Sequence, residues 1–311
     1  MLNPLIILII GLLVLLKGSD YFIEAAAYIA RYFGIAELII GLTIVSMGTS
    51  LPELGVSVYA SYGGSGGIAV GNVVGSNIAN IALVLGLIII FTSIKTDEKM
   101  LKRDGYFMLG ASFLFAAMVF LGNHISRVDG VILMLLFIFY LRLLYKQRSE
   151  GVVTGIDSDP EGDNGVMRAL LKLVGGGMAV FVGARLLVTS ALSIAYMIGV
   201  SEGVIGSTLV AFGTSLPELV VSVTAIKKGY THISIGNIIG SNIFNILWVL
   251  GLASLVSPLA ANDVLMWFNI PMMLVVAALL VIFMKFGSEL DRKEGLLFVA
   301  LYLFFLVVNF W

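Results

Sequence analysis

The sequence predicts an all-α membrane protein with ten transmembrane helices in two inverted five-helix repeats. Three observations predict this fold: the composition, a series of ten long apolar segments, and an internal repeat. Of the 311 residues, 59% are hydrophobic and only 12% are charged. A soluble domain is about 45–50% apolar and about 25% charged. The excess of apolar residues therefore indicates a chain embedded in a lipid bilayer.

Ten apolar segments are long enough to cross a bilayer, for which a helix needs about 20 residues. They are too long to be the strands of a membrane barrel, which have about 9–11 residues. The first and sixth segments are the longest, and we expect each to be one tilted helix. The ten segments are, roughly, Leu2–Phe33, Glu37–Ala60, Ile68–Ile94, Gly105–Leu121, Val128–Tyr145, Val166–Ile198, Gly203–Ile226, Ile233–Val256, Val264–Met284 and Gly295–Trp311.

The Lys and Arg residues predict the orientation, because they concentrate in cytoplasmic loops. With ten spans and an outer N-terminus, the cytoplasmic side receives 15 of the 18 basic residues, and the outer loops receive only Arg127. We therefore expect a multi-pass protein of the cell membrane with both termini outside. Residues 1–145 and 166–311 form the two repeats, and residues 146–165 form a cytoplasmic linker. Its acidic stretch, Asp157–Asp163, resembles the start of an EF-hand loop, but Pro160 interrupts it and we interpret it as solvated linker.

The internal repeat aligns residues 40–86 with residues 205–251 without a gap, and 28 of the 47 aligned positions are identical. Both copies contain Gly-Thr-Ser-Leu-Pro-Glu-Leu, at 48–54 and 213–219, and Gly-Ser-Asn-Ile-x-Asn, at 75–80 and 240–245. Five spans per repeat is an odd number, so the second repeat enters the membrane from the opposite side. The loop at 61–67 has no Lys or Arg, whereas its counterpart contains Lys227 and Lys228. This pattern is typical of inverted-repeat transporters, whose sites lie near the midplane.

Glu53 and Glu218 lie inside apolar segments in which no Lys or Arg occurs. A charged side chain at the bilayer centre costs about 2.5–3.5 kcal/mol or more, so each carboxyl is either protonated or binds a cation. The prolines that precede them favour a cation, because Pro52 and Pro217 cannot donate a hydrogen bond to the carbonyl four residues back. We therefore expect each helix to kink or unwind, exposing carbonyl oxygens around 46–49 and 211–214.

Further oxygen ligands occur at matching positions of the two repeats. They comprise four hydroxyls and two polar stripes spaced i, i+4, i+8: Thr49, Ser50, Thr214 and Ser215; Asn72, Ser76 and Asn80; Asn237, Ser241 and Asn245. Such an all-oxygen set suits Ca²⁺ and Na⁺, and suits Mg²⁺ less because Mg²⁺ retains waters. Two ionised Glu would neutralise one Ca²⁺ or two Na⁺, which is a physical basis for exchange.

Other residues of these segments are interpreted as structural. Hydrogen bonding is expected at Ser57, Ser222, Asn77 and Asn242, and helix packing at Gly75, Gly86, Gly240 and Gly251. Lys17, Asp20 and Glu24 are spaced i, i+3, i+7 in the first segment, and we expect a local ion pair there.

Several classes of function are disfavoured. The net charge of −1 argues against nucleic-acid binding, and zero Cys with two His argues against thiolate or multi-His metal sites. No nucleophile or nucleotide loop lies near the two acids, so an enzyme is not expected. A channel is also less favoured, because nothing indicates a continuous pore. We expect no organic cofactor, no protein partner and no nucleic acid, and only the bilayer and the cations as partners.

Because of its two repeated motifs, the chain resembles the Ca²⁺:cation antiporter superfamily, and it looks most like the prokaryotic sodium/calcium exchangers of that superfamily. The resemblance implies electrogenic exchange of Na⁺ for Ca²⁺ by alternating access, with the first and sixth helices sliding against the other eight. The alternative within transport is H⁺/Ca²⁺ exchange. The Ser/Thr-rich flanks favour Na⁺.

The resemblance also implies roles for individual residues. Glu53 and Glu218 would be ligands shared by Ca²⁺ and Na⁺, with the carbonyls of Thr49 and Thr214 completing the Ca²⁺ site. Flanking Na⁺ sites would be lined by the carbonyls of Ser46 and Ala211 with Ser50, Ser76, Ser215 and Ser241, and Asn80 and Asn245 would occupy the middle. Some similar exchangers have Asp at the position of Asn245, and the large regulatory loop of the animal exchangers is absent here.

Overall fold

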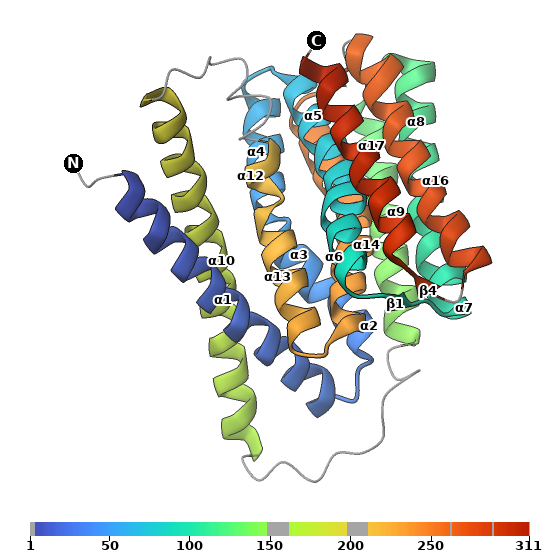
Figure 1. Cartoon of the computed structure of the whole chain (residues 1–311). Helices are drawn as coiled ribbons and strands as arrows, with labels where there is room; N and C mark the ends of the chain where they lie inside the picture. The colour runs from blue at the N-terminus through green and yellow to red at the C-terminus, as the bar shows by residue number, and fades with distance from the viewer. Residues whose placement is uncertain (1–3, 148–161, 198–210, 262, 288, 311) are drawn as a thin grey trace. The chain divides into compact units, whose positions relative to one another are not determined.

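The apolar segments of the sequence form the helices of the computed structural model in Figure 1, which describes residues 4–147, 162–197, 211–261, 263–287 and 289–310. The chain divides into two compact units. The first comprises Met1–Thr49 and Arg142–Asn237, and the second comprises Ser50–Leu141 and Ile238–Trp311. Each unit therefore draws segments from both predicted repeats. Most of the linker, residues 148–161, lies outside the described residues.

The first unit contains the two longest helices of the described chain. Helix α1 spans Pro4–Tyr32 and α10 spans Gly162–Met197, and Figure 1 shows them side by side. Each is one continuous helix, which confirms that the first and sixth segments each form a single helix and not two short ones. The unit also contains α2 (Glu37–Ile40), the π-helical turn η1 (Gly41–Val45), α3 (Ser46–Thr49), α12 (Ala211–Thr214), α13 (Leu216–Lys227) and the start of α14 (Thr231–Phe244).

Glycines bring α1 and α10 into close contact. A Cβ atom at Gly18 would lie 2.7 Å from the Cβ of Ala179, and one at Gly176 would lie 2.7 Å from the backbone nitrogen of Phe22. Position 18 faces 179 and position 22 faces 176, so the two helices run antiparallel. Small residues permit this approach because nothing larger fits between the backbones. The packing role predicted for glycine also holds at Gly86 and Gly251, whereas a Cβ at Gly75 would meet open space.

The acidic residues of α1 have a different partner from the one predicted. Lys228, in the turn after α13, lies 2.8 Å from Glu24 Oε1 and 3.4 Å from Asp20 Oδ1. The expected local pairing with Lys17 is therefore wrong. Hydrogen bonding to Glu24 raises the pKa of Lys228, which keeps the amine charged. These contacts fasten the middle of α1 to the end of α13.

The second unit is built from the remaining helices and four short strands. It contains α4 (Leu51–Tyr62), α5 (Gly66–Ile78), η2 (Ala79–Leu85), α6 (Gly86–Phe91), β1 (Ile94–Lys95), α7 (Glu98–Met100), η3 (Leu101–Gly105), α8 (Tyr106–Gly122), β2 (His124–Ile125), α9 (Arg127–Lys146), η5 (Asn245–Val249), α15 (Leu250–Val256), β3 (Leu259–Ala260), η6 (Leu265–Asn269), α16 (Ile270–Phe286), β4 (Glu289–Leu290) and α17 (Arg292–Phe310). Helix α9 extends five residues into the first unit.

The strands pair across the sequence halves. β1 pairs antiparallel with β4, and β2 pairs antiparallel with β3. The bounds of β3 equal those of β1 plus 165, and the bounds of β4 equal those of β2 plus 165. The 165-residue offset thus extends beyond the aligned motifs to the short strands between helices.

Seven helices of the described residues are long and apolar enough to cross a membrane, and the broken pair Glu37–Thr49 and Leu51–Tyr62 raises the number to eight. Helices α13 and α17 are not among these candidates. The fold is therefore a mainly helical one with several candidate spans.

Candidate functional site

Both acidic residues of the repeated motif follow a break in a helix. The backbone leaves the helical region at Ser50 (φ −88°, ψ 12°) and at Ser215 (φ −88°, ψ 1°), and a proline occupies the first turn of the helix that follows. The predicted interruption is therefore confirmed. The predicted kink or unwinding lies one residue later than expected, because residues 46–49 and 211–214 form the single helical turns α3 and α12 and the break follows each turn. Proline has no backbone N–H to donate to the carbonyl four residues earlier, and its ring clashes with that carbonyl. The helix therefore breaks shortly before each proline.

The structure places six of the twelve predicted ligands in each unit. In the second unit are Ser50, Glu53, Ser76, Asn80, Ser241 and Asn245; in the first are Ser46, Thr49, Ala211, Thr214, Ser215 and Glu218. All of these side chains are buried except that of Ala211, which lies outside the described side chains. Buried polar side chains are uncommon, so those of each unit need hydrogen-bond partners or a bound ligand.

Glu53 lies on α4 with a hydrogen-bonding network around it. Its side chain is 0% exposed, and Ser76 Oγ of α5 lies 3.3 Å from its Oε1. Asn72 Nδ2 donates to the backbone oxygen of Glu53 at 3.1 Å and to Ser57 Oγ at 3.0 Å. Side chains from α5 therefore fix both the backbone and the carboxylate of Glu53.

Glu218 lies at the matching position of α13 and is also 0% exposed. The network of the first repeat recurs here, because Asn237 Nδ2 donates to Ser222 Oγ at 2.9 Å. The hydroxyl of Thr49 lies 3.0 Å from Asn237 Oδ1. The interpretation of Ser57 and Ser222 as structural residues is confirmed, since both accept from the asparagine that supports the acidic helix.

Asn80 and Asn245, the last residues of the two polar stripes, lie in matching π-helical segments, η2 and η5. Asn245 Nδ2 donates to Asn77 Oδ1 at 3.1 Å, and Asn77 Nδ2 donates to the carbonyl of Asn242 at 3.2 Å. Asn77 and Asn242 therefore have the structural role predicted for them. π-Helical segments often occur at functional sites, because they add a residue to one turn and redirect its side chain.

Several buried polar atoms of the predicted ligands lack a hydrogen-bond partner within the described parts of the chain. They are both side-chain polar atoms of Asn80, Oδ1 of Asn245, and Oγ of Ser215. A buried polar group without a partner costs about 1–3 kcal/mol, so native proteins retain few of them. The unpartnered oxygens fit the chemistry of a bound cation or water, whereas the Nδ2 donor of Asn80 fits an acceptor such as water.

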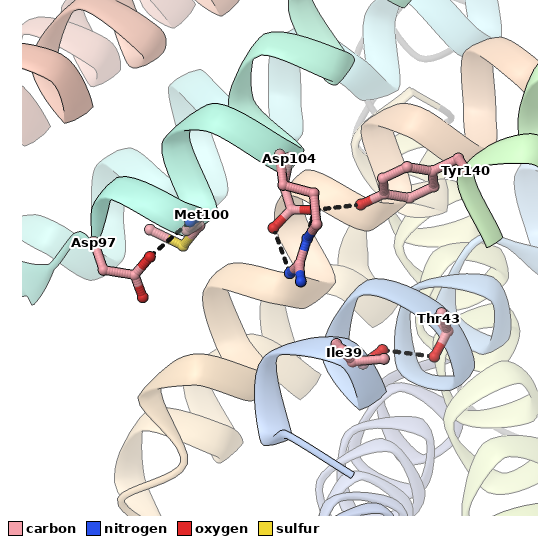
Figure 2. Close-up of polar contacts among 7 residues, drawn as sticks. Ile39, Thr43, Asp97, Met100, Asp104 and Tyr140 are labelled. Carbon is pink, nitrogen blue, oxygen red and sulfur yellow. Dashed lines mark hydrogen bonds and ion pairs between the residues drawn. The ribbon is translucent and has the colours of Figure 1, made fainter. Parts of the chain in front are cut away.

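Sequence reasoning missed one buried charged cluster, on the second unit. Figure 2 shows the Tyr140 hydroxyl directed at the carboxylate of Asp104, at 2.9 Å. Arg103 donates to both carboxylate oxygens at 2.8 Å, and Asp104 is 0% exposed. Asp104 was assigned to a loop because the predicted span began at Gly105. The sequence signal for the longer helix is Asp97, whose side chain accepts from Met100 N at 2.6 Å and caps α7 (Figure 2).

Comparisons with known proteins place this chain in a family. The family described as "Sodium/calcium exchanger protein" matches twice, over residues 3–146 and 168–311. The chain is 38% identical to the sodium/calcium exchanger MaX1 of Methanosarcina acetivorans, over 98% of both proteins. It is also 41% identical to an uncharacterised membrane protein of Methanocaldococcus jannaschii, over 95% of this chain and 94% of that one.

A solved structure has the same fold. The sodium–calcium exchanger NCX_Mj, soaked with Na⁺ and Ca²⁺, superposes with a TM-score of 0.86 at 38% identity, covering 99% of this chain and 98% of that one. The fold and the repeated acidic motifs thus define a multi-pass membrane transporter. The chain belongs to the sodium/calcium exchanger family.

Proposed function

We propose that this chain exchanges Na⁺ for Ca²⁺ across the cell membrane by alternating access. The observation that supports it best is the pair Glu53 and Glu218, each fully buried after a helix break in a chain of this family. A charge of about −2 without a cation is costly in hydrocarbon. One Ca²⁺ or two Na⁺ would neutralise it, so the loaded forms should cross far more readily than the empty one.

The proposed architecture is ten transmembrane helices in two inverted repeats, residues 1–145 and 166–311, joined by the linker 146–165. The two family matches support it, because both begin and end 165 residues apart. The exchange of strand partners, β1 with β4 and β2 with β3, also fits two repeats of opposite direction. Inverted repeats allow alternating access, because each repeat can adopt the conformation of the other.

The proposed ligands are those of the two matching motifs. Glu53 and Glu218 would bind both ions, with the carbonyls of Thr49 and Thr214 at the Ca²⁺ site. The flanking Na⁺ sites would use the remaining oxygens, from Ser46, Ser50, Ser76, Ala211, Ser215 and Ser241. Asn80 and Asn245 would lie at the middle position. The unsatisfied atoms of Asn80, Asn245 and Ser215 support a bound ion or water at these places.

The proposed orientation has both termini outside and the linker in the cytoplasm. The distribution of Lys and Arg supports it, since 15 of 18 basic residues then lie on the cytoplasmic side. The ions are transported substrates, so no organic cofactor, protein partner or nucleic acid is required.

Proton/calcium exchange is the less favoured alternative. A buried Glu can bind a proton, so the carboxylates alone do not decide between H⁺ and Na⁺. The relatives named sodium/calcium exchangers favour Na⁺. So do the hydroxyls of the two motifs, which belong to Ser50 and Ser215 just before the acids and to Ser76 and Ser241 in the next helix.

Isotopic Ca²⁺ uptake into proteoliposomes tests the proposal. With pH clamped, an outward Na⁺ gradient should drive uptake, and K⁺ or H⁺ gradients should not. Glu53→Gln and Glu218→Gln should each abolish uptake, because the charge that binds the cation is removed. Glu98→Gln is the control, since Glu98 is exposed at the start of α7. Uptake at the wild-type rate in either site variant would contradict the proposal.

A further inference from the structure

A groove lies on the second unit between α4 and α15, away from the buried face of α4. Its volume is about 530 Å³, within the range of small-molecule pockets. Leu51, Leu54 and Val58 line one wall, and Leu252 and Val256 line the other. The lining is almost wholly apolar, so it suits a hydrocarbon ligand.

Two opposite stripes on α4 explain the position of the groove. The groove residues 51, 54, 55, 58, 59 and 62 follow the spacing of one helix face. Glu53 and Ser57 occupy the opposite, buried face toward α5. Gly55 forms part of the groove, and a Cβ atom there would meet nothing within 4 Å. The missing side chain at Gly55 therefore contributes to the hollow.

One end of the groove has the polar character of a membrane interface. Tyr59 and Tyr62, at the end of α4, are 79% and 81% exposed. Tyrosine is enriched where lipid headgroups begin, because its ring is apolar and its hydroxyl is polar. Ser61 Oγ donates to the carbonyl of Ala253 at 2.7 Å, which holds this end of α4 against α15.

A cationic side chain lies at the same end. Arg127 donates to the carbonyl of Val256, a groove residue, at 3.2 Å and is itself exposed. That hydrogen bond uses one of the five N–H donors of a guanidinium, and the fork that remains suits a phosphate. The groove therefore presents apolar walls, then interfacial tyrosines, then an arginine. This is the order of the acyl chain, the glycerol and the phosphate in a phospholipid.

We propose that this groove binds one phospholipid of the bilayer, with an acyl chain between α4 and α15 and the phosphate on Arg127. A protein segment fits less well, because the walls offer no polar groups for its backbone. The lipid would fill the space behind the helix that contains Glu53, and so hold α4 against α5. This last consequence rests on the proposed function, whereas the binding itself does not.

Native mass spectrometry of the full chain, released from detergent after incubation with phosphatidylglycerol, tests the site. Wild type should retain one lipid. Gly55→Leu should lose it, since a Cβ there would meet nothing within 4 Å and the leucine side chain would occupy the groove in place of the lipid. Gly110→Leu is the matched control, because Gly110 is also an exposed helical glycine whose Cβ would meet nothing within 4 Å. Arg127→Gln should lower retention about tenfold.

The other outcomes overturn the proposal. Equal retention by wild type and Gly55→Leu, or no retention by wild type, would exclude the groove as a lipid site. Unchanged retention by Arg127→Gln would exclude the phosphate contact. A dimer mass that Gly55→Leu abolishes would assign the groove to a second copy of the chain. None of these readings depends on ion transport, so they are independent of the uptake assay.

Discussion

At the scale of single residues, the hydrogen bonds around Glu53 show how neighbouring side chains hold a buried acid in place. Glu53 is held by two hydrogen-bonding side chains of α5, one to its carboxylate and one to its backbone. A carboxylate that binds an ion must keep its oxygens at fixed positions, and its supporting hydrogen bonds determine those positions. We therefore interpret Asn72 and Asn237 as positioning residues, whereas the sequence grouped both with the oxygen ligands of the two polar stripes.

We predict that Asn72→Ala raises the Ca²⁺ concentration for half-maximal uptake by about 10–100-fold, as expected for a residue that orients a ligand. Maximal uptake should fall less, because Glu53 itself remains. The measurement is Ca²⁺-dependent uptake in proteoliposomes. Asn309→Ala is the control, since the amide of Asn309 bonds within its own helix, to the carbonyl of Phe305. An unchanged half-maximal concentration would assign Asn72 to packing alone.

Sequence reasoning identifies the proposed ligands more readily than the residues that support them. An acidic residue in an apolar span is conspicuous because its burial is costly, so Glu53 and Glu218 stand out without a structure. The role of Asn72 depends on how closely α4 approaches α5, which tertiary packing decides. For the same reason the cation partner of Glu24 was misassigned, since Lys228 is 204 residues away in sequence.

At the scale of elements, buried charge and glycine contacts fix how helices meet. Asp104 joins η3 to α9 through Tyr140, and Arg103 neutralises it. Where the structure describes them, the apolar segments predicted from the sequence are helical, yet the start of one was placed seven residues late, at Gly105 instead of Glu98. The first turns of this helix contain charged residues, so a search for apolar periodicity does not include them. Its start is marked instead by an N-cap residue.

We predict that Arg103→Gln destabilises the protein by about 3–5 kcal/mol, because it leaves a buried carboxylate without its cation. Tyr140→Phe should cost about 1.5–3 kcal/mol, since one hydrogen bond to a charged group is lost. Thermal unfolding in detergent measures both. Lys102→Gln should leave the Tm nearly unchanged, because its ion pair with Glu98 is exposed. Equal Tm values for all three variants would show that the cluster contributes nothing.

Neighbouring glycines on α10 allow a second test at this scale. Gly176→Ala should destabilise by about 1–3 kcal/mol, because the added methyl group would lie 2.7 Å from the backbone of α1. Gly175→Ala should stabilise by about 0.5–1 kcal/mol, because its Cβ meets open space and alanine favours helix. The measurement is the Tm of each variant, relative to wild type, in thermal unfolding. The same sign of Tm shift in both would contradict the close packing of α1 and α10.

At the scale of the whole molecule, the repeat was visible in the sequence and the compact units were not. Identical motifs 165 residues apart reveal the repeat directly. The units each combine segments of both repeats, since Ser50 begins one segment of the second unit and Ile238 begins the other. Such a division follows from long-range contacts between helices, which local patterns do not encode.

The proposed opposite direction of the two repeats gives a topology prediction that the cysteine-free sequence makes simple to test. Tyr62 and Lys227 occupy equivalent positions 165 residues apart, and both are exposed. A membrane-impermeant thiol reagent should label Tyr62→Cys in intact cells, and Lys227→Cys only after permeabilisation. His124→Cys and Glu289→Cys form a second equivalent pair with the same expected contrast. If both members of a pair were labelled from one side, the repeats would run in the same direction, and alternating access by exchange of their conformations would have no structural basis.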